Sequence, residues 1–234
     1  MNFGGRVVIV SGGTGGLGQA VVTALVAAGA RVAVPYRGEA GWQKLEAATP
    51  GDALWGRSCD IAELGPTAAF VRETIAALGR LDGLCTLAGG YAGAGPLEAS
   101  PADEWEAMLR INLQTTYTLC RAVLPHLLKT GGTIVTVGSR VVEAGGAGAA
   151  AYAVSKAGVH ALTRALAAEN RDRGVRVNAV VPGVIDTAAN RAAMPKADAA
   201  RWAAPADIAQ VVLFLLSESS APVSGALVPV YGRS

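Results

Sequence analysis

A cluster of glycines directly after a short apolar segment is the feature that most constrains the fold of this chain. Residues 7–10 are apolar, Ser11-Gly12-Gly13-Thr14-Gly15-Gly16-Leu17-Gly18 follows, and residues 19–28 show helical periodicity. Glycine permits a sharp turn and a close approach to a phosphate, and a helix N-terminus offers unpaired N–H groups. The order strand, glycine loop, helix predicts a dinucleotide-binding βαβ unit, with a flexible turn as the plainer alternative.

The same alternation of strand and helix continues along the chain. Strands are predicted at residues 7–10, 31–34, 54–59, 84–87, 133–137, 175–181 and 227–230, and helices at 19–28, 41–49, 66–78, 101–129, 152–170 and 205–217. Gly29 is typical of a helix end, Ser100 and Pro101 of a helix start, Pro125 of a kink, and Pro229 of an edge strand. Strands that are apolar on both faces predict a parallel sheet. We expect one α/β domain over residues 1–234, a Rossmann-type doubly wound sheet of about seven strands with helices on both faces.

The composition argues against several classes of protein. Of 234 residues 51% are hydrophobic and 16% charged, and the formal net charge of +2 comes without a basic run, so nucleic acid is not expected as a partner. Cys59, Cys85 and Cys120 are scattered, which predicts reduced core thiols in a cytoplasmic protein. With only His126 and His160, no His/Cys metal cluster is expected. No signal peptide and no membrane-spanning apolar segment is visible.

The end of the second predicted strand bears on the choice of cofactor. Here the sequence reads Pro35-Tyr36-Arg37, and the nearest acid is Glu39. An acid at this point would bind a ribose 2′-OH and repel a 2′-phosphate, whereas Arg37 would pair with the phosphate. The sequence therefore favours NADP(H), with NAD(H) possible. The alternative is that Arg37 is a solvated loop residue.

A tyrosine and a lysine occur four residues apart in a predicted helix. Tyr152 and Lys156 share one helix face, and a nearby ammonium favours the phenolate, so Lys156 is expected to lower a phenol pKa that is ordinarily about 10. The pair alone is common on surface helices. Ser139, however, directly follows the fifth predicted strand and precedes Tyr152 by 13 positions. Asn112 lies in the long predicted helix, and Pro182-Gly183 and Thr187 follow the sixth strand.

These motifs, in order from Gly12 to Thr187, resemble the short-chain dehydrogenase/reductase family over nearly the whole chain, including its Gly12-x-x-x-Gly16-x-Gly18 spacing. The resemblance implies hydride transfer between nicotinamide C4 and a carbonyl or alcohol carbon. Tyr152 would be the general acid or base, Lys156 would hold the nicotinamide ribose, Ser139 would bind the carbonyl oxygen, and Asn112 would hold a water. The implied cofactor contacts are Gly12, Thr14, Gly16, Leu17, Gly18, Tyr36, Arg37, Asp60, Ile61, Ala88, Gly89, Tyr152, Lys156, Pro182, Gly183, Val184, Ile185 and Thr187.

The chain departs from the family pattern at two places. The usual Asn-Asn-Ala-Gly is Thr86-Leu87-Ala88-Gly89, so local hydrogen bonding should differ, and the usual C-terminal Asp-Gly is Tyr231-Gly232. Residues 88–93, 186–202 and 224–225 resemble quinonoid dihydropteridine reductases more narrowly. Those enzymes prefer NADH and generally lack the serine, unlike a chain with Arg37 and Ser139. Pterin reduction is therefore an alternative activity, and shared ancestry without a shared substrate is another explanation.

Partners follow from the same resemblance. We expect a small-molecule substrate and a homo-oligomer, dimer or tetramer, because residues 105–129 and 152–170 resemble the family's dimer-forming helices. Residues 187–205 are a candidate lid, and Tyr91, Met194 and Trp202 are candidates to line a substrate pocket. An alternative of another class is a non-catalytic NADP(H)-binding sensor or scaffold. The intact set of Asn112, Ser139, Tyr152 and Lys156 argues against it.

Overall fold

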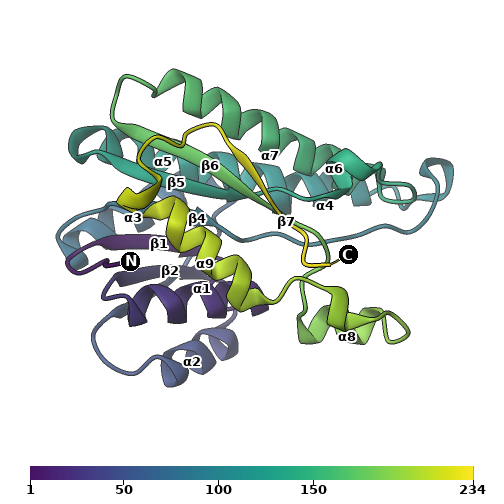
Figure 1. The fold of residues 1–234 in the computed structure, drawn as a ribbon, viewed down its shortest axis with the longest axis horizontal. Coiled ribbons are helices and arrows are strands. Elements are labelled where there is room, and N and C mark those ends of the chain that lie inside the picture. Colours follow the sequence, from purple (N-terminus) through teal and green to yellow (C-terminus); the bar gives the residue numbers. More distant parts are fainter. Residues whose placement is uncertain (234) are drawn as a thin grey trace.

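Seven apolar segments form one parallel sheet in the computed structural model, which describes residues 1–233 (Figure 1). In this part of the chain the strands are β1 (Val7–Ser11), β2 (Arg31–Tyr36), β3 (Leu54–Ser58), β4 (Gly83–Thr86), β5 (Gly132–Val137), β6 (Val175–Pro182) and β7 (Leu227–Val230). Their order is β3-β2-β1-β4-β5-β6-β7, and every neighbouring pair is parallel. The order reverses between β1 and β4, which is where ligands bind in such sheets.

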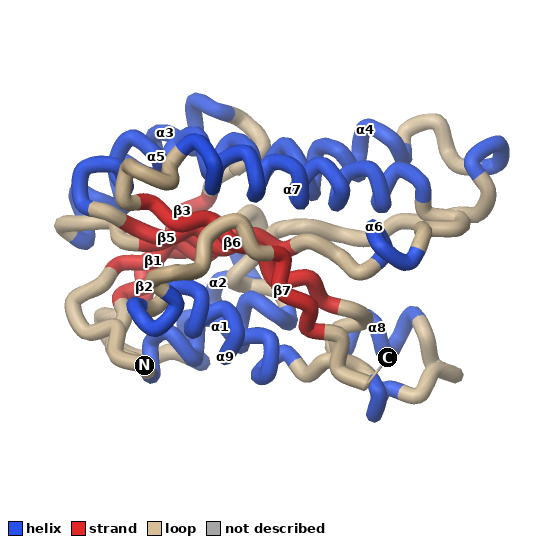
Figure 2. Tube along the Cα trace, turned by 45° about the horizontal axis from the view of Figure 1, so that its top comes forward, coloured by secondary structure: helices blue, strands red, loops and turns tan. Residues whose placement is uncertain are grey.

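Helices cover both faces of the sheet (Figure 2). One layer contains α1 (Gly16–Ala27), α2 (Glu39–Ala48) and α9 (Pro205–Leu216), and the other contains α3 (Leu64–Leu78), α4 (Glu104–Met108), α5 (Thr115–Thr130) and α7 (Ala150–Glu169). Side chains of β1 alternate between the two, since Val8 and Val10 join one core cluster and Val7 and Ile9 the other. The predicted doubly wound α/β fold is confirmed, and β7 with its Pro229 is an edge strand, as expected.

The long helix predicted over residues 101–129 is present, but it begins at Glu104 and its middle is π-helical: α4 continues through a π-helical segment (Leu109–Gln114) into α5. A 3₁₀ turn (Leu97–Ala99) precedes it. Ser100 does not cap α4, because its hydroxyl donates to the Leu97 carbonyl at 2.9 Å, and Asp103 is the residue before α4. Pro125 lies inside α5 without ending it.

Short helices lie in segments for which no periodic pattern predicts a helix. They are α6 (Val141–Ala144) after β5, α8 (Ala188–Ala193), and 3₁₀ turns at Ala199–Arg201 and Glu218–Ser220. The candidate lid thus contains α8, which Thr187 caps by accepting from the Asn190 N–H at 3.2 Å. All three cysteines are buried, as predicted, and they are free thiols. No helix within residues 1–233 is both long and apolar enough to cross a membrane.

Candidate active site

The glycine loop between β1 and α1 is packed too tightly for side chains. A Cβ on Gly18 would lie 2.0 Å from the Gly12 carbonyl oxygen, and one on Gly16 would lie 2.9 Å from Cγ2 of Thr187. Gly12 has φ +67° and its Cβ would meet the Ala88 nitrogen at 2.7 Å. No side chain caps the start of α1, and its first turn holds no acid. The loop therefore presents an open helix N-terminus, the arrangement that binds phosphate.

A cavity of about 560 Å³ opens beside this loop at the carboxyl ends of β1 to β4. Eight of the predicted cofactor contacts line it: Gly12, Thr14, Tyr36, Arg37, Asp60, Ile61, Ala88 and Gly89. Gly16, Leu17, Gly18, Pro182, Gly183, Val184, Ile185 and Thr187 do not line this cavity, although Thr187 contacts the loop through Gly16. The structure thus brings together the predicted residues from the first four strands in one cavity.

The ribose side of the cavity is formed by the end of β2. The Tyr36 ring stacks on Trp42 with centroids 5.1 Å apart. The pKa of Tyr36 is raised, first by burial and then by the nearby Glu39 carboxylate. Arg37 is an exposed residue on the cavity wall, so this wall carries a cation that a bound molecule can reach.

Asp60 lies across the cavity and is held by two donors. Its carboxylate accepts from the Ala62 N–H at 3.0 Å and from Arg110 at 2.8 Å. The Ala62 hydrogen bond is the main cause that lowers the pKa of Asp60, and Arg110 adds to it. The sequence prediction missed Arg110, which also binds Glu63 at 2.9 Å and lines the cavity.

Tyr152 and Lys156 lie on α7 and face the end of β5. The Lys156 ammonium is 6% exposed and donates to the Val137 carbonyl at 3.0 Å. Burial lowers the pKa of Lys156 to about 8. The pKa of Tyr152 is raised, because burial disfavours the phenolate and Tyr91 adds to this, although a hydrogen bond with the Ser139 side chain opposes it. The prediction that Lys156 lowers this pKa is wrong here, since the phenol is buried and the ammonium bonds Val137 instead.

Tyr91 forms one wall of the space in front of Tyr152. The two rings meet edge to face with centroids 5.0 Å apart and an interplanar angle of 73°. Tyr91 is 68% exposed, so a bound molecule can reach its ring. That Tyr91 lines a substrate cleft stays a prediction.

Asn112 is fully buried in the π-helical segment. Its side-chain amide donates to the Gly90 carbonyl at 3.1 Å and to the Ser155 hydroxyl at 3.2 Å, and its oxygen accepts from the Gly90 N–H at 3.0 Å. A Cβ on Gly89 would lie 2.6 Å from this oxygen and 3.4 Å from Nζ of Lys156. Asn112 therefore joins the loop after β4 to α7. Its expected role in holding a water stays a prediction.

The two departures from the family pattern have local explanations. After β4, the Ser11 hydroxyl accepts from the Ala88 N–H at 3.2 Å, while the buried Thr86 hydroxyl has no hydrogen-bond partner within residues 1–233. At the other end of the chain the Tyr231 hydroxyl donates to Glu143 at 2.6 Å, and the Arg140 guanidinium lies 5.0 Å from the Tyr231 ring centroid. Tyr231 thus packs the last strand against α6, which follows Ser139.

Comparisons with known proteins agree with this geometry. A family model described as enoyl-(acyl carrier protein) reductase matches residues 12–232. The chain is 34% identical to an L-fucose dehydrogenase of Oryctolagus cuniculus, over 93% of this chain and 81% of that one. It is 35% identical to a D-threitol dehydrogenase of Mycolicibacterium smegmatis, over 95% and 90%. The solved structure of a short-chain type dehydrogenase/reductase from Mycobacterium ulcerans superimposes with a TM-score of 0.92 and 29% identity, covering 100% of this chain and 90% of that one.

Proposed function

The chain belongs to the short-chain dehydrogenase/reductase family, and on that premise we propose that it transfers hydride between NADP(H) and a small carbonyl or alcohol substrate, with Tyr152 as general acid and base. One observation carries the proposal. Ser139, Tyr152 and Lys156 meet at the carboxyl edge of β5, beside a cavity walled by the glycine loop. A proton donor, an ammonium and a phosphate-binding loop at one edge of a sheet are what such a reaction needs.

The residues present fit a nicotinamide dinucleotide. The glycine loop leaves the space that a Cβ would fill, and the uncapped start of α1 suits a pyrophosphate. Asp60 and Ile61 line the part of the cavity proposed to hold the adenine. A Cβ on Gly89 would lie 3.4 Å from Nζ of Lys156, so this ammonium can reach the ribose next to the nicotinamide. When bound, the nicotinamide supplies or accepts the hydride.

The protein's own groups handle the proton. In reduction the Tyr152 hydroxyl donates its proton to the carbonyl oxygen as the carbon gains the hydride, and in oxidation the phenolate takes the proton back. A raised pKa keeps Tyr152 in the phenol form at neutral pH, ready to donate. The Ser139 hydroxyl hydrogen-bonds the same oxygen as negative charge develops there. The Lys156 ammonium binds ribose hydroxyls of the cofactor.

Arg37 supports NADP(H) as the preferred cofactor. Its guanidinium is exposed on the cavity wall, where it can form a charge-assisted pair with a 2′-phosphate. The nearest acid, Glu39, does not line the cavity. NAD(H) remains the alternative.

The names of the relatives suggest a class of substrate. They include dehydrogenases of a sugar and of a sugar alcohol, so a small hydroxylated carbonyl or its alcohol is the first class to test. Pterin reduction is the alternative activity suggested by the loop sequences.

The decisive experiment measures turnover of purified protein with both cofactors. NADPH and NADH oxidation is followed with simple ketones, quinones and quinonoid dihydropterin, and NADP⁺ and NAD⁺ reduction with L-fucose and D-threitol. Tyr152→Phe should lose turnover and keep its affinity for the cofactor, because it removes only the acidic hydroxyl. Turnover with dihydropterin alone would favour the pterin activity. Cofactor binding without any turnover would favour the sensor or scaffold.

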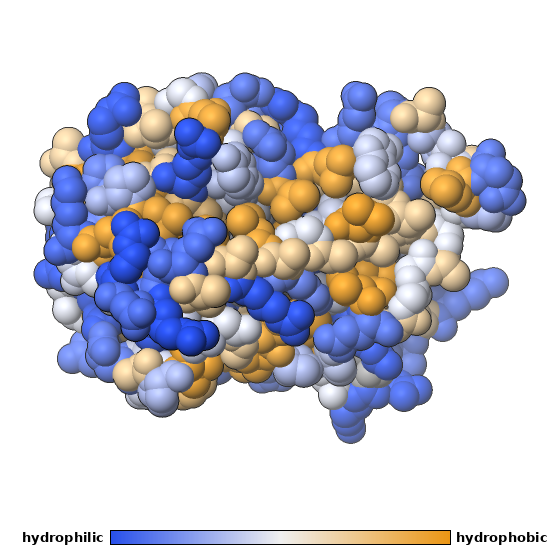
Figure 3. Space-filling view, turned by 90° about the horizontal axis from the view of Figure 1, so that it is seen from above, coloured by the Kyte–Doolittle hydropathy of each residue, from blue (hydrophilic) through white to orange (hydrophobic). Residues whose placement is uncertain are grey.

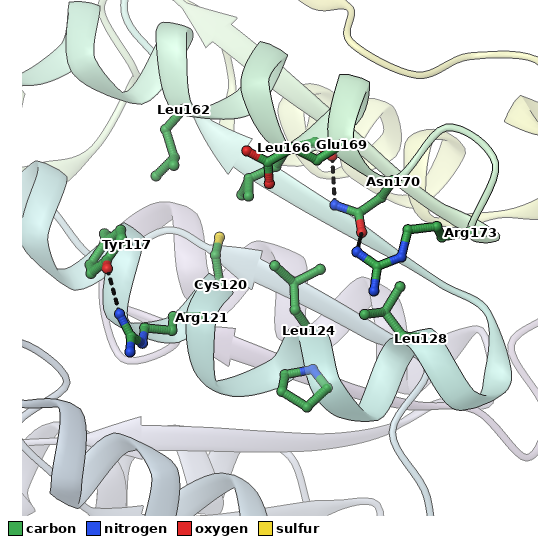
Figure 4. A pocket seen from close by; sticks show the side chains of 11 residues that line it. Tyr117, Cys120, Arg121, Leu124, Leu128, Leu162, Leu166, Glu169, Asn170 and Arg173 are labelled. Atoms are coloured by element: carbon green, nitrogen blue, oxygen red, sulfur yellow. Dashed lines mark hydrogen bonds between the residues drawn. The ribbon is translucent and has the colours of Figure 1, made fainter.

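We also propose a homo-oligomer, formed through the face of α5 and α7. Figure 3 shows apolar side chains gathered on this side of the molecule, and Tyr117 and Val154 are 38% and 46% exposed there. A groove of about 290 Å³ runs between the two helices (Figure 4), lined by Tyr117, Cys120, Arg121, Leu124, Pro125, Leu128, Leu162, Leu166, Glu169, Asn170 and Arg173. Exposed apolar surface of this kind is commonly covered by a second copy.

A further inference from the structure

One turn beyond Lys156, α7 places a histidine against the backbone of Ser139. The Nε2 atom of His160 accepts a hydrogen bond from the Ser139 N–H at 3.3 Å, and both residues are buried. Tyr152, Lys156 and His160 are spaced by four residues, so they form one stripe of the helix that faces the end of β5. Neither the sequence motifs nor the proposed proton transfer uses this histidine.

The backbone after β5 explains why an acceptor is needed there. Gly138 N–H donates to the Val180 carbonyl at 2.9 Å and Arg140 N–H to the Pro182 carbonyl at 3.0 Å, both on β6. N–H groups alternate between the two sides of a strand, so the Ser139 N–H points away from β6. On that side β4 has already ended at Thr86. A buried N–H without a partner is costly, and the His160 ring supplies the partner.

Gly138 makes room for this ring. A Cβ on Gly138 would lie 2.1 Å from Nε2 and 2.5 Å from Cδ2 of His160, and the three nearest atoms all belong to that ring. Any side chain at position 138 would therefore displace the imidazole. The His160 ring can therefore lie against Ser139 only because residue 138 is glycine.

We propose that His160 is a positioning residue for Ser139, holding its backbone by accepting the N–H at Nε2 so that the hydroxyl stays aimed at Tyr152 and the substrate oxygen. This inference rests on the proposed oxidoreductase function. It requires a neutral ring with its proton on Nδ1. Protonation of Nε2 would place two donors against each other and push Ser139 out of place.

The charges around His160 favour the neutral ring. Burial is the main cause that lowers its pKa below 6.5, and Arg164 and Lys156 from the same helix lower it further. The carboxylate of Glu143 on α6 acts in the opposite direction and raises the pKa of His160. The acceptor is thus available at neutral pH and is lost on acidification, so activity should fall on the acid side as His160 titrates.

The test compares His160→Phe with His160→Gln. Phenylalanine fills the space without an acceptor, whereas the glutamine amide oxygen reaches the place of Nε2 and does not titrate. We expect kcat for His160→Phe to fall by about 10- to 100-fold, as for a displaced catalytic group, with the KM for cofactor little changed. His160→Gln should keep most of kcat and lose the acid limb of the pH profile of carbonyl reduction, in which Tyr152 stays protonated throughout. His126→Gln, which replaces the other histidine, is the matched control and should leave both unchanged.

Two further measurements keep the outcomes distinct. Gly138→Ala should lose as much activity as His160→Phe. The double variant should lose no more activity than either single variant. In His126→Gln the single remaining imidazole can be read by ¹⁵N NMR, and an unprotonated Nε2 with a protonated Nδ1 is expected at pH 7. An active wild type with an unaffected His160→Phe, or a protonated Nε2 at pH 7, would overturn the inference. A wild type without turnover would refute the proposed function, and the NMR result would still decide the inference.

Discussion

Replacing Lys156 by methionine should make the protein more stable while it removes activity. The Lys156 side chain is 6% exposed, its ammonium has the Val137 carbonyl as its hydrogen-bond acceptor at 3.0 Å, and no carboxylate within residues 1–233 forms a salt bridge with it. Burial lowers its pKa from 10.5 to about 8, so at neutral pH it is still largely charged. The folded state therefore holds a charge that the interior disfavours.

The size of the effect follows from the fall in pKa. A change from 10.5 to about 8 corresponds to about 3 kcal/mol, at roughly 1.4 kcal/mol for each pKa unit. Methionine has a similar length and no charge, but it leaves the Val137 carbonyl without its donor, which costs about 1 kcal/mol. Lys156→Met should thus gain about 2 kcal/mol in the free energy of unfolding at pH 7.

The sign of the pH dependence is fixed by the direction of the shift. Because the pKa is lower in the folded than in the unfolded state, wild-type stability falls as pH drops from 10.5 towards 8. The gain in Lys156→Met should therefore be complete below about pH 8 and should shrink as pH rises towards 10.5.

Urea unfolding without cofactor at pH 7 and pH 10, at one protein concentration, measures this gain. Lys44→Met, at an exposed position on α2, is the matched control and should change stability by no more than about 0.5 kcal/mol. A Lys156→Met protein with unchanged or lower stability at pH 7, at the same m-value, would refute the reasoning. Its turnover should fall by about 100-fold or more, since a contact that orients the cofactor ribose is lost.

Three other predictions address the cofactor, the proton and the assembly. Arg37→Asp should lower the NADPH/NADH ratio of kcat/KM by at least about 10-fold, because a charged hydrogen bond of roughly 1.5–3 kcal/mol becomes a repulsion, and an unchanged ratio would contradict the ribose argument. The raised pKa of Tyr152 predicts that alcohol oxidation accelerates as pH rises from 7 to 10, because the phenolate becomes more abundant, while carbonyl reduction stays nearly level until the phenol ionises above pH 10; oxidation that does not accelerate would contradict it. Leu162→Asp in the groove should sediment as a monomer, whereas Leu64→Asp, at an exposed apolar position on α3, should keep the wild-type assembly. A monomeric wild type at micromolar concentration would exclude the proposed interface.

The order of strands and helices could be predicted because each element has its own local hydrophobic pattern. Strands buried on both faces are continuous apolar runs, and the glycine loop marks the first crossover. The π-helical segment within the predicted long helix could not be found in this way. Asn112 bonds the backbone of Gly90, 22 positions away, in the π-helical segment, and a contact at that distance leaves no trace in periodicity.

The candidate catalytic side chains were chosen for a different reason, since their identities and spacing are themselves the signal. The residues that position these side chains could not be predicted from the sequence. Arg110 forms an ion pair with Asp60, 50 residues earlier in the chain. His160 binds a backbone N–H, a group that every residue except proline has, so the sequence does not mark it. The pKa of Tyr152 could not be predicted either, because burial and Tyr91 decide it rather than the lysine four residues away.

The polar stripe on α7 gives opposite expectations for two neighbouring positions. Lys156 is a buried charge whose removal should stabilise the fold, whereas His160 satisfies a buried N–H that the sheet itself cannot pair. His160→Phe leaves the Ser139 N–H without an acceptor and should cost about 1–3 kcal/mol, although the new side chain is more apolar. Denaturant unfolding of both variants without cofactor tests this contrast, since simple replacement of a buried polar group by an apolar one would predict stabilisation in both. If His160→Phe also proves more stable than the wild type, the Ser139 N–H does not depend on the imidazole, and the stripe positions the serine by packing alone.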